Sequence, residues 1–155
     1  MSALYSSLYG AVPTGGTSAG AAVTTNAYVY NGPMPDNVGQ TMTRVATYTG
    51  TIANGDVLHL AKASEGEKLV SLDISMSADP DTDNDGAVDV GLTSDPNGIL
   101  AASTAFQAGA DVTVQASGKA VLGLTAVQGD EYLLTMTTGE HEVSVTYTFT
   151  IVAGL

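Results

Sequence analysis

The sequence has 155 residues, a length that suits one domain with a sizeable buried core. It carries 4 basic and 16 acidic residues, for a net charge of −12, which argues against binding to nucleic acids or anionic membranes. The chain contains no cysteine, so disulfides, zinc–thiolate sites and cysteine nucleophiles are excluded. No apolar run reaches the roughly 18 residues of a membrane span. The first residues also lack the pattern of a signal peptide.

The first 40 residues differ in composition from the rest of the chain. They form an almost uncharged tract rich in Gly, Ala, Ser and Thr, in which the first acidic residue is Asp36. A disordered tail is one interpretation, although such tails usually carry charge and few aromatic residues. The alternative is an extended arm, residues 1–40, that becomes ordered on another subunit. Its candidate anchors are Tyr5, Tyr9, Tyr28 and Tyr30.

The remainder, residues 41–155, alternates between apolar and polar side chains with the period of β-strands. Two clear alternating runs begin at Val70 and Val88. The segment 99–108, which follows the second run, predicts a short helix or a wide loop. The clearest run closes the chain, because apolar residues from Val143 to Ile151 alternate there with serine and threonine. Weaker strands are predicted at Arg44–Ile52, Val57–Ala61, Val112–Gln115, Ala120–Thr125 and Tyr132–Thr137.

About eight short strands separated by turn signals such as Asn97-Gly98 predict an all-β domain. The spacing favours a jelly-roll-like β-sandwich, residues 41–155, preceded by the extended arm. Abundant threonine and valine with scarce lysine support the same fold class. The strand order cannot be derived from these patterns, so other sandwich topologies stay open.

An acidic run between two predicted strands is the strongest candidate for a binding site. Asp81, Asp83 and Asp85 precede Gly86 with the spacing D-x-D-x-D-G, which brings carboxylates together around a hard cation such as calcium. Asp89 is a fourth candidate ligand that would act through water. An EF-hand is excluded, because Leu92 stands where that loop needs a glutamate. A shorter calcium loop and a solvated acidic turn both remain open.

Other motifs give no support for catalysis. The stretch 16–20 matches the pattern G-x-S-x-G, but its flanks are not the strand and helix of a nucleophile elbow. His59 and His141 lack the spacing of a zinc site, and each is expected to be a structural or surface histidine. We therefore expect that the protein is not an enzyme and needs no cofactor other than the calcium considered above.

The segment Gly55–Ser103 resembles the head-decoration, or cement, proteins of tailed bacteriophages. These proteins share a "GDV" phrase, a long amphipathic strand, an Asp/Asn-rich loop and a "DVG" phrase, and they close with a long alternating strand, here Val143–Val152. The resemblance implies a small β-sandwich on the outer capsid surface, often as a homotrimer, whose N-terminal arm reaches neighbouring capsomers. It implies no catalytic residues.

Together, the residues and the resemblance predict a structural virion protein that stabilises a phage head by bridging capsid subunits through its arm. The expected partners are the major capsid protein and further copies of the chain, with no nucleic acid or membrane. Assembly is expected in the host cytoplasm and residence on the outer capsid surface. The alternative is a receptor- or carbohydrate-binding sandwich of a phage fibre or knob, although the absence of tryptophan disfavours sugar stacking.

Overall fold

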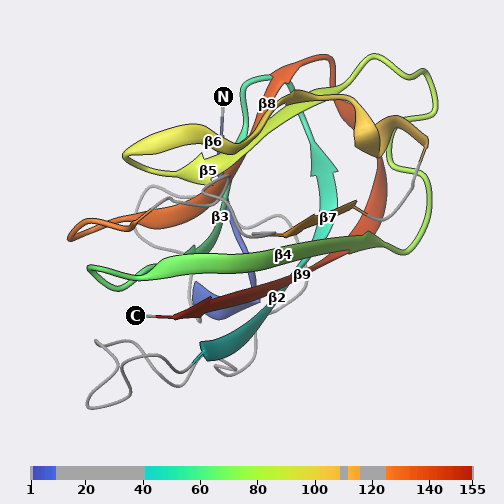
Figure 1. The fold of residues 1–155 in the computed structure, drawn as a ribbon. Coiled ribbons are helices and arrows are strands. Elements are labelled where there is room, and N and C mark those ends of the chain that lie inside the picture. Colours follow the sequence, from blue (N-terminus) through green and yellow to red (C-terminus); the bar gives the residue numbers. More distant parts are fainter. Residues whose placement is uncertain (1, 10–40, 109–111, 116–124, 155) are drawn as a thin grey trace.

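The computed structural model describes residues 2–9, 41–108, 112–115 and 125–154, and every structural statement below concerns these residues. They form two β-sheets that face each other (Figure 1). The elements in chain order are β1 (Ala3–Tyr5), η1 (Ser7–Tyr9), β2 (Thr41–Ile52), β3 (Val57–Lys62), β4 (Lys68–Met76), β5 (Ala87–Leu92), β6 (Asp95–Ser103), η2 (Ala105–Ala108), β7 (Val112–Gln115), β8 (Glu131–Thr138) and β9 (His141–Gly154). The predicted all-β sandwich is confirmed.

The strand pairing follows one long antiparallel ribbon. Strand β2 pairs with β9, β3 with β8, β4 with β7, and β5 with β6. The ribbon is folded so that β9 also pairs with β4, and β8 with β5. The sheets consequently have the orders β2-β9-β4-β7 and β1-β3-β8-β5-β6. Strands β2, β3, β4 and β5 therefore alternate between the two sheets along the chain.

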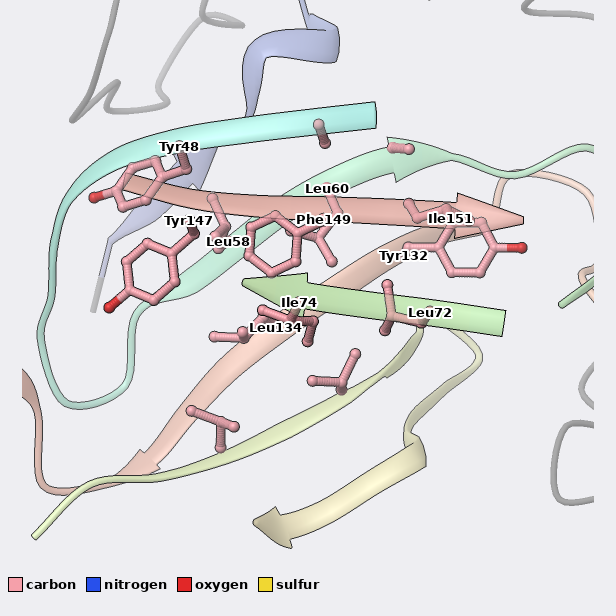
Figure 2. Packing of buried hydrophobic residues seen from close by; sticks show 14 of the residues in the cluster. Tyr48, Leu58, Leu60, Leu72, Ile74, Tyr132, Leu134, Tyr147, Phe149 and Ile151 are labelled. Carbon is pink, nitrogen blue, oxygen red and sulfur yellow. The ribbon is translucent and has the colours of Figure 1, made fainter. Parts of the chain in front are cut away.

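Strand β9 lies inside the four-stranded sheet and shows the predicted alternation. Tyr147, Phe149 and Ile151 are fully buried, whereas Thr148 and Thr150 between them are half-buried on the other face. Successive side chains of a strand point to opposite faces, so the apolar set enters the space between the sheets. Figure 2 shows this set packed against leucines of the opposite sheet. The long closing strand predicted from Val143 to Ile151 is confirmed.

Strand β4 departs from the predicted alternation at its start. The pattern beginning at Val70 places this side chain inward, but Val70 is 41% exposed and Leu69 is buried in its place. The reason is a bulge in β4. Leu69 pairs with Ala153 of β9 and Ser71 pairs with the neighbouring Val152, so β4 has one extra residue at this point. An extra residue in one strand reverses the faces on either side of it. Leu72 again points inward, as the sequence predicts.

The segment 99–108 divides between two elements. Its first residues continue β6, and only Ala105–Ala108 forms a short helical turn, so neither a single helix nor a wide loop is present. The turn expected at Asn97-Gly98 is found earlier, at Thr93 and Ser94. Asp130 fixes it there, because its carboxylate accepts hydrogen bonds from the Ser94 amide and hydroxyl at 2.9 and 2.8 Å. Of the strand expected at Ala120–Thr125, all but the last residue lies outside the described residues.

The first residues of the chain belong to the β-domain. Strand β1 runs parallel to β3, with Ala3 opposite Val57 and Tyr5 opposite His59. Leu4 and Leu8 are buried in the core. Residues 2–9 are thus part of the sandwich and not of the extended arm that the sequence predicted for residues 1–40. The rest of the predicted arm, residues 10–40, lies outside the described residues.

Candidate functional site

Tyr5 and Tyr9, two of the predicted anchors, contact a histidine and a glutamate of their own domain. The Tyr5 ring stacks on His59, with ring centroids 4.7 Å apart. The Tyr9 hydroxyl donates a hydrogen bond to Glu131 at 2.8 Å, and His59 Nδ1 lies 3.0 Å from the second carboxylate oxygen of Glu131. The hydrogen bond with His59, followed by the one from Tyr9, lowers the pKa of Glu131, although burial opposes this change.

Backbone contacts hold residues 2–9 against both sheets. The Ser2 amide donates to Asp56 at 2.7 Å, and the Ser6 hydroxyl donates to the carbonyl of Leu60 at 2.5 Å. On the other sheet, the amide of Thr47 donates to the Ser7 hydroxyl at 2.8 Å. Residues 2–9 thereby connect β2, at the edge of one sheet, to β3 of the other sheet. The other two predicted anchors, Tyr28 and Tyr30, lie outside the described residues.

The acidic loop between β4 and β5 brings three of the four predicted ligands together. Carboxylate oxygens of Asp81, Asp83 and Asp85 lie within 4.8 Å of one another. Asp81 is fully buried, and its two oxygens accept hydrogen bonds from the amides of Asp85 at 3.2 Å and Gly86 at 2.9 Å. Asp83 and Asp85 are exposed. The buried carboxylate therefore organises a loop that presents the other two to solvent.

The fourth predicted ligand, Asp89, does not join this cluster. It lies within β5, and its carboxylate accepts a hydrogen bond from the amide of Ala102 at 2.7 Å. Ala102 has a positive φ of 46°, which is uncommon for a residue with a side chain. Asp89 thus supports the irregular edge strand β6. The extended backbone of β5 explains the separation, because it carries Asp89 away from the turn that gathers the first three acids.

The start of β9 and the turn before it anchor the acidic loop. Asp85 accepts a hydrogen bond from the amide of Glu140 at 3.1 Å, and the amide of Thr82 donates to Glu142 at 2.8 Å. The Thr82 hydroxyl donates to the same glutamate oxygen. Gly139, with a φ of 60°, also approaches this loop, since a Cβ there would come within 2.1 Å of an Asp85 oxygen. The loop is thus tied to the end of the molecule where β8 and β9 meet.

Electrostatics in the loop reflect its crowded negative charges. The pKa of Asp83 is raised, first by its hydrogen bond with Asp81 and further by the negative charges of Asp85 and Glu142. The pKa of Glu142 is lowered, because the bonds from Thr82 stabilise its charged form. Neither of the two ion pairs found in the described part of the chain includes an acid of this loop.

His141 lies beneath the acidic loop and was not predicted to take part in it. Only 1% of its surface is exposed, and its Nδ1 lies 2.8 Å from the hydroxyl of Tyr147 in the core. Its Nε2 is buried without a hydrogen-bond partner. Burial lowers the pKa of His141, and the charges of Asp81 and Glu142 oppose that change. The sequence contains no signal for this position, because it depends on a loop some 60 residues earlier in the chain.

The outer surface of the four-stranded sheet forms a second candidate contact region, here called the threonine face. Registered pairing sets its side chains in rows, such as Thr47 opposite Thr148 and Thr148 opposite Ser75. The face comprises Thr43, Val45, Thr47, Thr49, Ser71, Asp73, Ser75, Thr146, Thr148, Thr150 and Val152. Asp73 is the one charged residue among these positions, which is unusual on a protein with a net charge of −12.

The G-x-S-x-G stretch at 16–20 lies outside the described residues. Within the described ranges, neither histidine takes part in a cluster of potential metal ligands. The same residues contain no helix long and apolar enough to cross a membrane.

Comparison with solved structures finds this fold in phage capsids. A chain from the capsid of Ralstonia phage GP4 matches with a TM-score of 0.62 and 21% sequence identity, covering 82% of this chain and 92% of that one. A chain from the capsid asymmetric unit of cyanophage Pam1 matches with a TM-score of 0.58 and 18% identity, covering 84% of this chain and 97% of that one. No protein-family model and no curated protein matches the sequence. The chain therefore shares its fold with chains of two phage capsids.

Proposed function

We propose that the protein is a structural component of a phage virion, a decoration protein that binds the outer surface of the capsid and stabilises the head. The observation that carries this proposal is the match to two capsid chains, each of which is covered almost completely. The proposal assigns no reaction to the protein. Assembly would take place in the host cytoplasm, and the finished protein would stay with the particle.

The strand pairing supports the topology expected for such a protein. An antiparallel ribbon that pairs β2 with β9, β3 with β8, β4 with β7 and β5 with β6 corresponds to a jelly roll. We therefore assign strands β2–β9 to this topology, with β1 as an additional parallel strand. A jelly roll leaves the outer faces of both sheets available for contacts with other subunits.

The distribution of charge supports a place outside the shell. Of the 16 acidic residues, 15 lie in the body, which would be repelled by packaged DNA because DNA carries a dense negative charge. In contrast, residues 10–40 contain a single acidic residue, Asp36, and no basic residue. Such a segment loses little hydration energy when it is laid along another protein. We therefore assign the bridging of capsid subunits to residues 10–40, with Tyr28 and Tyr30 as anchors.

Stabilisation would arise by mass action. A protein that binds the assembled lattice but not the separated subunits shifts the equilibrium toward the shell. Several weak contacts per particle then add up through avidity, provided that body and arm can bind at the same time. The major capsid protein is the proposed partner.

We also propose that copies of the chain associate as a homotrimer through the threonine face. Negatively charged bodies repel each other least where they meet at a surface with few acids, and Asp73 is the one acid of this face. The mass in solution tests this part, because a trimer has three times the mass of the chain and a monomer would contradict the assignment.

The role of the arm is tested by replacing residues 10–40 with a Gly-Ser linker of equal length. This change keeps residues 2–9 and their contacts with β3, so the body should unfold at the same temperature as the wild type. Co-sedimentation with capsids that lack the protein is then measured for both chains. We expect the linker variant to lose binding at least tenfold.

The matched control replaces only Tyr5 by Phe. Tyr5 stacks on His59 within the body, and phenylalanine retains an aromatic ring there. This variant should bind capsids like the wild type. Undiminished capsid binding by the linker variant would instead remove residues 10–40 from the proposed mechanism.

A further inference from the structure

We propose that the acidic loop binds one calcium ion through Asp81, Asp83 and Asp85. This inference goes beyond the proposed virion role and does not depend on it. The carboxylate oxygens of these residues lie within 4.8 Å of one another, a separation compatible with three ligands of one calcium ion, whose bonds are about 2.3–2.6 Å long.

Backbone hydrogen bonds hold the central ligand in place before an ion arrives. Asp81 is fully buried, and its carboxylate accepts hydrogen bonds from the amides of Asp85 and Gly86. Each carboxylate oxygen can accept more than one bond, so these contacts leave capacity for a cation. Asp85 uses one oxygen for the amide of Glu140 and keeps the other available. The exposed Asp83 completes the set from the solvent side.

His141 gives an independent indication that a polar group belongs beneath the loop. Its Nδ1 is directed to Tyr147 in the core, so the opposite edge of the ring, formed by Cδ2 and Nε2, faces the other way. A Cβ on Gly86 would lie 3.0 Å from both the Cδ2 of His141 and an oxygen of Asp81. The Cδ2 atom, which is bonded to Nε2, and an oxygen of Asp81 therefore lie beside the same point next to Gly86.

The Nε2 atom is buried and has no hydrogen-bond partner, which is rare for a polar atom inside a protein. The ring is 1% exposed, and the charges of Asp81, Glu142, Asp79 and Asp85 all act on it. An ion with its bound water supplies the polar partner that Nε2 lacks. Because residue 86 is a glycine, it places no side chain between the His141 ring and the Asp81 carboxylate.

The charge of the loop favours a divalent ion. Neither ion pair in the described ranges involves its carboxylates, so the mutual repulsion of these acids is not offset by lysine or arginine there. Calcium accepts six to eight oxygen ligands in flexible arrangements, whereas magnesium demands a near-ideal octahedron and shorter bonds. Three carboxylates from one short loop, completed by water, suit the larger and more adaptable ion.

The test uses the isolated full-length protein, so it is independent of capsid binding. Thermal melting is recorded in 1 mM EDTA and in 1 mM CaCl₂ at matched ionic strength, and titration calorimetry counts bound ions. We expect a higher melting temperature with calcium and one ion per chain. An unchanged midpoint without a binding heat would overturn the proposal and leave the virion role untouched.

Two variants distinguish a specific calcium site from a general effect in which calcium screens the negative charge of the protein. Asp83→Asn removes a ligand that is exposed, so the fold should persist while the calcium-dependent rise is lost. Asp95→Asn removes one exposed negative charge outside the loop and should retain the rise. A rise in melting temperature that persists in Asp83→Asn would overturn the site.

A matched MgCl₂ sample should give a smaller rise in melting temperature than CaCl₂. An equal rise would overturn the assignment to calcium.

Discussion

At the residue scale, a buried ion pair on the four-stranded sheet is joined to the opposite sheet by Tyr132. Arg44 of β2 and Glu67, which precedes β4, are both almost fully buried, and their charged atoms lie 2.5 Å apart. The hydroxyl of Tyr132 in β8 donates to the same glutamate at 2.7 Å, and the Arg44 guanidinium lies over the Tyr132 ring. Sequence patterns place Arg44 in a strand, but its burial depends on a partner from another strand connection and could not be predicted.

We predict that Glu67→Gln lowers the free energy of unfolding by about 3–5 kcal/mol, because it leaves a buried guanidinium without its counter-charge. Glutamine keeps the shape of the side chain and can still accept the bond from Tyr132. The double variant Arg44→Met/Glu67→Gln buries no charge and should therefore be more stable than Glu67→Gln alone. Urea denaturation at neutral pH measures both differences, and additive losses would rule out this coupling.

We expect the attachment of the N-terminal residues to depend on pH through Glu131. Its pKa is lowered in the folded protein, chiefly by the hydrogen bond with His59. A group with a lowered folded pKa stabilises the protein above its unfolded pKa, about 4.3 for glutamate, and the contribution is lost as pH falls through the folded pKa.

We therefore predict that Glu131→Gln is less stable than the wild type above about pH 4.3 and that the difference shrinks at lower pH. Urea denaturation between pH 3 and pH 7 measures this convergence. A constant difference across that range would show that the carboxylate charge makes no contribution.

The elements show which parts of the fold local patterns can predict. The alternation from Val143 to Ile151 identified β9 correctly, because a central strand with one buried face keeps strict period two. The bulge in β4 escaped prediction, since it is defined by pairing to β9 and leaves no local signal at Val70. The same limit applies to the site. A local motif identified Asp81, Asp83 and Asp85, which the structure brings together, whereas His141 and Glu142 come near the loop only through the fold.

The bulge in β4 can be tested by comparing the stability of variants at Leu69 and Val70. We predict that Val70→Ser changes the free energy of unfolding by less than about 0.5 kcal/mol, as is usual for exposed positions. Leu69→Ser should cost at least about 2 kcal/mol, because Leu69 is buried. Urea denaturation of the two variants distinguishes this register from simple alternation, which would give the reverse order.

At the scale of the whole molecule, charge and fold support the same account. The all-β sandwich was predicted from composition and turn spacing, and the likeness to capsid chains agrees with the resemblance noted in Gly55–Ser103. The limits of the arm were predicted less well. Lack of charge marked residues 1–40 as one tract, but Leu4 and Leu8 supply apolar contacts that bind its first residues to the body.

Electron cryo-microscopy of phage heads assembled with and without this protein tests the central claim most directly. The account predicts additional density on the outer surface of the shell, shaped as a β-sandwich, with a connected segment that reaches a neighbouring capsid subunit. Density inside the shell, density confined to the tail, or identical heads in both preparations would contradict it.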